Sequence, residues 1–341
     1  MKHHSAILRF IILAFTASIL ISCNQGSNKG NDGQSDTIPV ALRQFNEKIA
    51  GDANNPTYHY ERAKWLAENS RFPGALTDIG IALDHDTLNP DYFVTLGDVY
   101  LGLAKFSNAE NAYLKALKIN PKHNDALLQL AKYHLVFKNY DQTLMLAEEA
   151  LKEKPQNPKA YYLAAFSFME KGDTLKALRN FIKATEFDQN YFDAYIRLAL
   201  LYSKKQPKLA EGYFKRAIII KPAYAPARYL LAMFYQDNKQ IDKAILAYEQ
   251  ILTTNPHYKE AMFNLGYIFM AEKLDFDKAI TYFNQAISED ARYAEAYMNR
   301  GYCNEMIRNT EEAKTDYKMV LTLKPNFDKA VEGLNRIDAK K

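Results

Sequence analysis

The chain has 341 residues, of which 48% are hydrophobic and 25% are charged, so its composition is that of a folded protein and not of a disordered chain. Its formal net charge is +4, from 44 basic and 40 acidic residues. The sequence contains no basic run of the kind that nucleic-acid-binding proteins carry, so we expect no nucleic-acid partner.

The first 22 residues have the pattern of an export signal. MKHHSAILR is positively charged, and the apolar run FIILAFTASILI that follows is too short to span a bilayer. The last two residues of this run begin the tetrapeptide LISC (20–23). It resembles the lipobox of bacterial lipoproteins, in which the chain is cut before the cysteine and the cysteine receives acyl chains such as palmitate. We therefore predict a signal peptide over residues 1–22 and lipidation of Cys23. The alternative is an ordinary secretory signal with a cysteine near the cut by chance.

A flexible tether is expected after the lipidated cysteine. Residues 24–38, NQGSNKGNDGQSDTI, are rich in Gly, Asn and Ser and have no apolar periodicity. Cys23 and this tether together form the segment 23–38. The second of the two cysteines, Cys303, then has no partner for an internal disulfide.

Small residues recur along the rest of the chain at intervals of 33 to 35 residues. They are Ala41, Ala75, Ala109, Thr143, Ala177, Ala210, Ala244, Ala279 and Ala313. Four positions after most of them stands a larger residue, which is the spacing of one helix face. These larger residues are Ile79, Tyr113, Phe181, Phe214, Tyr248, Phe283 and Tyr317. A regular period of this length indicates a repeat architecture.

Each repeat also contains a helix that precedes the one just described, and this upstream helix has its own small residue. These residues are Ala63, Gly97, Ala131, Ala165, Ala199, Ala232, Gly266 and Gly301. A glycine or alanine at this place would let the two helices of a repeat approach closely.

The units resemble tetratricopeptide repeats (TPRs). The resemblance is clearest in the second unit, which reads Phe93, Leu96, Gly97, Tyr100, Ala109, Tyr113, Ala116 and Pro121. It implies an all-α fold, a right-handed superhelical TPR solenoid of helix-turn-helix repeats. We count eight repeats over residues 56–325, preceded by an N-terminal capping helix in 39–55 and followed by a C-terminal capping helix in 326–341.

In TPR solenoids the first helix of each repeat lines the concave side, so it needs a core face and a groove face. The segment EAMFNLGYIFMAEK, residues 260–273, has two apolar stripes that fit these two faces. The core stripe consists of Met262, Leu265, Gly266 and Phe269, and the groove stripe consists of Phe263, Tyr267 and Met270.

The groove register changes character along the chain. In the first three repeats its middle place holds Lys64, Asp98 and Lys132, and from the fourth repeat on this place is apolar or aromatic. We predict a partner-binding groove made of Tyr162, Phe166, Met169, Leu200, Tyr229, Met233, Phe263, Tyr267, Met270, Met298 and Tyr302. Exposed apolar surface marks binding sites, and Met and Tyr suit an adaptable site for a helix or an extended peptide. The alternative is that these side chains shield one another between neighbouring first helices.

Patterns that carry catalysis are absent from the sequence. It contains no HExxH motif and no cysteine pair, its histidines are dispersed, and its glycines form no phosphate-binding loop. We therefore expect no enzymatic activity, no cofactor and no metal.

The resemblance and the export signal together predict a function. We expect a lipid-anchored TPR scaffold of the bacterial cell envelope, anchored at the outer membrane, that binds a protein or peptide in its concave groove and helps assemble or maintain an envelope complex. A carboxylate clamp is not expected, because the groove offers Arg197 and Asn264 but no full set of clamp residues. The alternative is a glycan-binding lipoprotein of TPR-like fold; the near absence of insertions between the repeats favours protein binding.

Overall fold

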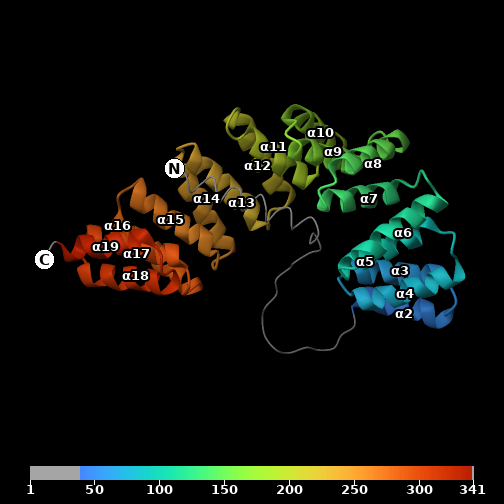
Figure 1. Ribbon diagram of the computed structural model, residues 1–341, viewed down its shortest axis with the longest axis horizontal. Helices are drawn as coiled ribbons and strands as arrows, with labels where there is room; N and C mark the ends of the chain where they lie inside the picture. The colour runs from blue at the N-terminus through green and yellow to red at the C-terminus, as the bar shows by residue number, and fades with distance from the viewer. Residues whose placement is uncertain (1–38, 340–341) are drawn as a thin grey trace. The chain divides into compact units, whose positions relative to one another are not determined.

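The computed structural model describes residues 39–339 of the chain (Figure 1). Within this range all regular secondary structure is helical, with eighteen α-helices and no strand, which confirms the predicted all-α fold. None of these helices is both long enough and apolar enough to cross a membrane. The predicted signal peptide, Cys23 and the tether lie outside the described residues.

The chain divides into two compact units, one up to Gln189 and one from Asn190 on. The helices of the first unit are α2 (Val40–Gly51), α3 (Pro56–Glu68), α4 (Phe72–His85), α5 (Pro90–Gly102), α6 (Phe106–Ile119), α7 (Asn124–Val136), α8 (Tyr140–Glu153), α9 (Pro158–Glu170) and α10 (Thr174–Phe187). The helices of the second unit are α11 (Phe192–Tyr202), α12 (Pro207–Ile220), α13 (Ala225–Asp237), α14 (Ile241–Thr254), α15 (Lys259–Ala271), α16 (Phe276–Glu289), α17 (Ala294–Met306), α18 (Thr310–Leu323) and α19 (Asp328–Asp338).

Each unit is a stack of helix pairs. An odd-numbered helix packs against the even-numbered helix that follows it, as α3 does against α4 and α15 against α16. We call the two members of a pair the first and the second helix. Neighbouring first helices also pack on each other, α3 on α5, α5 on α7 and α7 on α9 in the first unit, and α15 on α17 in the second. Stacked helix-turn-helix pairs are the arrangement that the repeat period predicts.

Most first helices end in the same way. The residue in the turn after the helix has a positive φ, at Ser70, Ala104, Lys138, Gly172, Lys239, Leu274 and Arg308. After α3, for example, the backbone N–H of Arg71 donates to the carbonyl of Leu66 at 2.8 Å, across the left-handed residue Ser70. This left-handed termination reverses the chain so that the second helix can pack back on the first.

The core of each pair is formed by the residues that carry the repeat period. The small residues of the second helices, such as Ala75 and Ala244, have no exposed surface. The larger residues four places further on are at most 1% exposed; they are Ile79, Tyr113, Phe181, Phe214, Tyr248, Phe283 and Tyr317. The periodic positions of the sequence are therefore the interior of the stack.

At Gly97 and Gly266 the two helices of a pair approach each other closely. A Cβ atom added to Gly266 would lie 2.7 Å from the ring of Phe283, and one added to Gly97 would lie 2.3 Å from the ring of Tyr113. Such distances are shorter than any van der Waals contact between carbon atoms. The aromatic ring of the second helix therefore occupies the space that a side chain would need.

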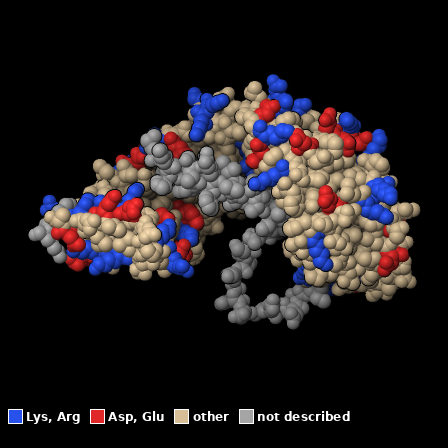
Figure 2. Space-filling model, viewed as in Figure 1, with Lys and Arg blue, Asp and Glu red and all other residues tan. Residues whose placement is uncertain are grey.

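The surface carries charges of both signs. Figure 2 shows Lys and Arg interspersed with Asp and Glu over the visible face, in keeping with a net charge of only +4. Several pairs link neighbouring repeats, among them Lys239 with Glu272 at 2.8 Å and Lys273 with Asp242 at 2.7 Å. Exposed pairs of this kind each contribute at most about 1 kcal/mol to stability.

The close approach at Gly266 predicts opposite effects for two glycine-to-alanine substitutions in the second unit. Gly266→Ala should destabilise the protein by about 1–3 kcal/mol, because the new methyl group overpacks the contact with Phe283. Gly212→Ala in α12, where an added Cβ meets nothing within 4 Å, should stabilise it by up to about 1 kcal/mol through helix propensity. Thermal melting of both variants tests these predictions. A Gly266→Ala variant as stable as the wild type would contradict the close approach of Gly266 and Phe283.

Candidate functional site

Three of the eleven predicted groove residues lie on α9 in the first unit. Phe166 is 3% exposed and Tyr162 is 8% exposed, whereas Met169 is half-buried. The ring of Tyr162 lies edge-on to the ring of Phe181, with 5.6 Å between the centroids. Two of these three side chains thus offer little surface to a partner.

The other eight predicted groove residues lie on first helices of the second unit. Met233 is 8% exposed and Tyr302 is 37% exposed, while the remaining six are half-buried. These six are Leu200 on α11, Tyr229 on α13, Phe263, Tyr267 and Met270 on α15, and Met298 on α17. We call the eight residues the inner face of the second unit. This face is partly covered and partly accessible.

Some of the side chains that pack on the inner face are not among the eleven predicted groove residues. The ring of Phe263 packs against Tyr293, with 5.0 Å between centroids, and the ring of Tyr229 packs against Tyr258 at 5.5 Å. Tyr258 and Tyr293 immediately precede α15 and α17. Together with Tyr224 before α13 they recur at intervals of 34 and 35 residues, so a periodicity signal for them was present in the sequence.

A hydrogen-bond network fixes the centre of the inner face. The Asn264 side-chain amide donates to the hydroxyl of Tyr229 at 2.9 Å and to that of Tyr248 at 3.1 Å. The Tyr248 hydroxyl in turn donates to the side-chain oxygen of Gln236 at 3.1 Å. Burial raises the pKa of Tyr229 to about 12, so its phenol remains protonated at neutral pH. Asn264, named above for an incomplete carboxylate clamp, thus joins α13, α14 and α15.

The first unit has a polar residue at the corresponding face. Asp98 on α5 is half-buried and accepts hydrogen bonds from the Tyr113 hydroxyl at 2.7 Å and the Gln129 amide at 3.3 Å. Burial raises the pKa of Asp98 to about 6, although the Tyr113 hydrogen bond and the charge of Lys132 act in the opposite direction. Asp98 is therefore a carboxylate held in an environment that disfavours its charge.

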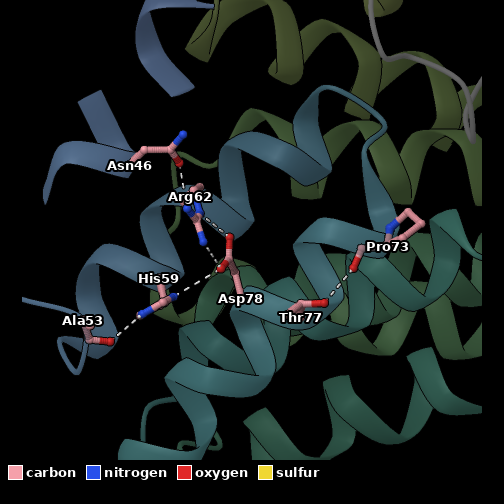
Figure 3. A network of polar contacts seen from close by, with 7 residues as sticks. All are labelled: Asn46, Ala53, His59, Arg62, Pro73, Thr77 and Asp78. Carbon is pink, nitrogen blue, oxygen red and sulfur yellow. Dashed lines mark hydrogen bonds and ion pairs between the residues drawn. The ribbon is translucent and has the colours of Figure 1, made fainter. Parts of the chain in front are cut away.

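Asp78 and Asp316, each 2% exposed, are held in structural networks. Arg62 donates to both carboxylate oxygens of Asp78 at 2.6 Å and to Asn46 at 2.7 Å, while His59 lies 3.2 Å from the same carboxylate (Figure 3). The second unit has the same arrangement, in which Arg300 binds Asp316 and Asn284. All of these groups are satisfied by each other. Within residues 39–339, no three His, Cys, Asp or Glu residues are grouped so as to hold a metal ion.

Comparison with known proteins identifies the repeats. One tetratricopeptide repeat model matches residues 94–158 and 271–326, and a second matches residues 201–257. Together these matches cover just over half of the chain. The chain belongs to the tetratricopeptide repeat family.

The curated relatives are longer proteins. A TPR repeat-containing protein of Methanocaldococcus jannaschii is 30% identical over 171 residues, which are 49% of this chain and 30% of that protein. The human protein O-mannosyl-transferase TMTC3 is 26% identical over 200 residues, 55% of this chain and 22% of that protein. DnaJ homolog subfamily C member 3 of Gallus gallus is 22% identical over 246 residues, 63% of this chain and 48% of that protein. The chain thus spans less than half the length of these relatives.

Solved structures share the fold at low identity. The human IFIT1 dimer with PPP-AAAA has a TM-score of 0.57 and 18% identity, with 87% of this chain and 77% of that chain covered. The APC/C hetero-tetramer Cut9-Hcn1 has a TM-score of 0.50 and 16% identity, covering 87% of this chain and 52% of that chain. At this level of identity the similarity concerns the TPR fold alone.

The raised pKa of Asp98 predicts a pH dependence of stability. Because the pKa rises from 3.8 to about 6 on folding, the folded state holds this proton more tightly than the unfolded state. Stability is therefore lost as the pH rises from about 4 through 6, and the loss is complete above the folded pKa. Asp98→Asn is neutral at every pH and can still accept from Tyr113.

The variant Asp98→Asn should melt several degrees higher than the wild type at pH 8, and this advantage should shrink as the pH falls towards 4. Melting curves at several pH values measure it. Asp84→Asn, at an exposed position on α4, is the control and should show no such trend. An Asp98→Asn variant with the same melting temperature as the wild type at every pH would show that the ionised carboxylate of Asp98 does not destabilise the folded state.

Proposed function

We propose that this protein is a lipid-anchored TPR scaffold of the bacterial cell envelope that binds a protein or peptide partner and helps to assemble or maintain an envelope complex. The observation that carries the proposal is the inner face of the second unit. Its half-buried Tyr, Phe, Met and Leu side chains come from four first helices, α11, α13, α15 and α17. An apolar surface that a fold leaves partly uncovered is a common feature of partner-binding sites.

The rings of the inner face favour a polypeptide over a glycan. Tyr229 and Phe263 pack on Tyr258 and Tyr293, so each of these rings has a face engaged within the protein. Sugar binding by stacking uses a free ring face, whereas a peptide can pack its side chains on ring edges, Met side chains and the Tyr302 ring. This supports protein binding as the main proposal and leaves glycan binding as the alternative to test.

The lipid anchor rests on the sequence of residues 1–38. The LISC tetrapeptide follows a charged start and an apolar run, and the Gly- and Asn-rich tether separates Cys23 from the repeats. Cys303 does not compete for modification. It is fully buried on α17, and burial raises the pKa of its thiol to about 12, so it remains an inaccessible protonated thiol.

Partner binding is tested by placing charge on the inner face. The double variant Tyr267→Glu with Tyr302→Glu should lose partner capture, because a carboxylate in a desolvated contact costs several kcal/mol unless it is paired. It should remain folded, since neither side chain is fully buried. Capture from native membranes followed by mass spectrometry, together with thermal melting, measures both effects.

Two further variants control this experiment. Leu246→Glu places a charge on the exposed side of α14, where the leucine is 56% exposed, and should leave capture unchanged. Leu265→Glu places it in the core, where the leucine has no exposed surface, and should unfold the repeat. A folded double variant that still captures the same proteins as the wild type would refute binding at the inner face.

Lipidation has its own test. Cys23→Ser should abolish labelling by a fatty-acid probe and release the protein from membranes, because the thiol is the site of acylation in a lipobox and stable anchoring needs the acyl chains. Cys303→Ala should keep both the label and the membrane fractionation. Equal labelling of Cys23→Ser and wild-type protein would exclude the anchor.

A further inference from the structure

The first turn of α15 carries a carboxylate with aromatic neighbours. Glu260 is half-buried, and it lies on the same side of α15 as Asn264 and Tyr267, since these residues are spaced by four and three positions. The Tyr229 hydroxyl accepts a hydrogen bond from Asn264, one turn further along α15, and the Tyr229 ring packs on Tyr258. Burial raises the pKa of Tyr229, Tyr258 and Tyr293, and the negative charge of Glu260 raises it further. We call Glu260, Asn264 and these three tyrosines the Glu260 site; all belong to the second unit.

The equivalent carboxylate in the next repeat is neutralised by a lysine. Glu295 occupies the corresponding place on α17 and forms an ion pair with Lys324, the residue immediately after α18. In the repeat of α15 and α16 the residue immediately after the second helix is Asp290, which instead binds the ammonium of Lys259 at 2.6 Å. Glu260 has no hydrogen bond or ion pair with any side chain in residues 39–339, although, after the hydrogen bond to Asp290, its charge is one of the smaller causes that raise the pKa of the neighbouring Lys259.

The tyrosines around Glu260 remain neutral. Burial raises the pKa of Tyr258, and the negative charge of Glu260 raises it further. Burial also raises the pKa of Tyr293, with smaller contributions from Tyr229 and Glu260. The hydroxyls therefore stay protonated, and the carboxylate is the acidic charge at the centre of the site.

An aromatic ring at the site already faces a cation. The ammonium nitrogen of Lys259 lies 5.6 Å from the centroid of the Tyr293 ring while it is held by Asp290. Electron-rich ring faces attract ammonium and guanidinium groups. A carboxylate between such rings attracts the same groups and repels acidic ones, and the rings pack on the methylene stems of long basic side chains.

We propose that the Glu260 site binds a basic side chain, a lysine or an arginine, of the polypeptide that occupies the inner face of the second unit. This rests on the proposed function, which it makes more specific: the partner presents a cation to the N-terminal end of α15 and apolar side chains to Tyr267, Met270 and Tyr302. The ammonium or guanidinium pairs with Glu260, and its stem packs on Tyr258 and Tyr293.

The test uses the full chain and labelled nonapeptides that share an Ala, Leu and Tyr background and differ at the central residue. Peptides with central Lys or Arg should bind about tenfold more tightly than those with norleucine or Glu, because a charge-assisted pair in a partly desolvated site contributes on this scale. Glu260→Gln should reduce this preference to less than about twofold, since the amide keeps the shape and removes the charge. Fluorescence anisotropy measures binding, and melting curves confirm that the variant is folded.

Glu295→Gln is the matched control, because it removes a carboxylate from the equivalent turn of α17 that Lys324 already neutralises. It should keep the preference for Lys and Arg. If Glu260 served only to stabilise the N-terminus of α15 through the helix dipole, Glu260→Gln would lower the melting temperature and leave the preference intact, which would overturn the inference.

The remaining outcomes separate this inference from the proposed function. Wild-type protein that shows no preference for basic peptides but still captures a protein from membranes overturns the Glu260 site alone. Failure to bind peptides and failure to capture a protein overturn both. Binding of neutral oligosaccharides that is lost in Tyr258→Leu and kept in Glu260→Gln also overturns both, in favour of a glycan-binding surface.

Discussion

The structure depends on one repeated contact, in which a large residue of the second helix packs against a small residue of the first. The ring of Phe283 occupies the space beside Gly266, and the ring of Tyr317 lies against both Gly301 and Gly333. Each such contact brings two helices together at a separation that a larger residue at the glycine position would prevent. This contact uses only one face of the first helix. The residues on the opposite face do not take part in it, so they can vary between repeats.

The fold could be predicted from the sequence because this contact recurs with the repeat. The small residues from Ala75 to Ala313 and the larger residues four places after most of them indicate the helix pairs from the sequence alone, and all of them are buried. The inner face was harder to predict. Helical periodicity assigns Phe166 and Met233 to the predicted groove, but periodicity cannot state how far neighbouring helices cover them. Their burial depends on packing between repeats, which the sequence of a single helix does not specify.

The Glu260 site shows a second limit of sequence reasoning. Glu260 and Glu295 are equivalent acidic residues in the first turns of α15 and α17, and nothing in either helix distinguishes them. The difference arises just after the second helices, where Lys324 pairs with Glu295, whereas the equivalent residue Asp290 is acidic and pairs with Lys259 instead of Glu260. Whether a charged residue of one repeat has an ion-pair partner therefore depends on residues of another helix, and it becomes visible only when equivalent positions of different repeats are compared.

The choice between tyrosine and phenylalanine in the core also affects the opposite face of the first helix. A buried tyrosine hydroxyl needs a hydrogen-bond partner, and a phenylalanine needs none. In the repeats whose second helix carries a tyrosine, the hydroxyl donates to a polar side chain of the first helix, at Asp98, Gln236 and Glu305. Arg336 of α19 also binds Glu305, so this buried carboxylate is fully paired.

In the repeats with Phe181, Phe214 or Phe283 this demand is absent, and the first helix presents mainly apolar side chains on its inner side. On α9 these are Phe166 and Met169, and on α15 they are Tyr267 and Met270. The second unit alternates, with phenylalanine in the pairs α11–α12 and α15–α16 and tyrosine in the pairs α13–α14 and α17–α18. One oxygen atom in the core of a pair thus requires one polar group on the first helix, while other positions on that helix can still be apolar, as Met233 on α13 and Met298 on α17 are.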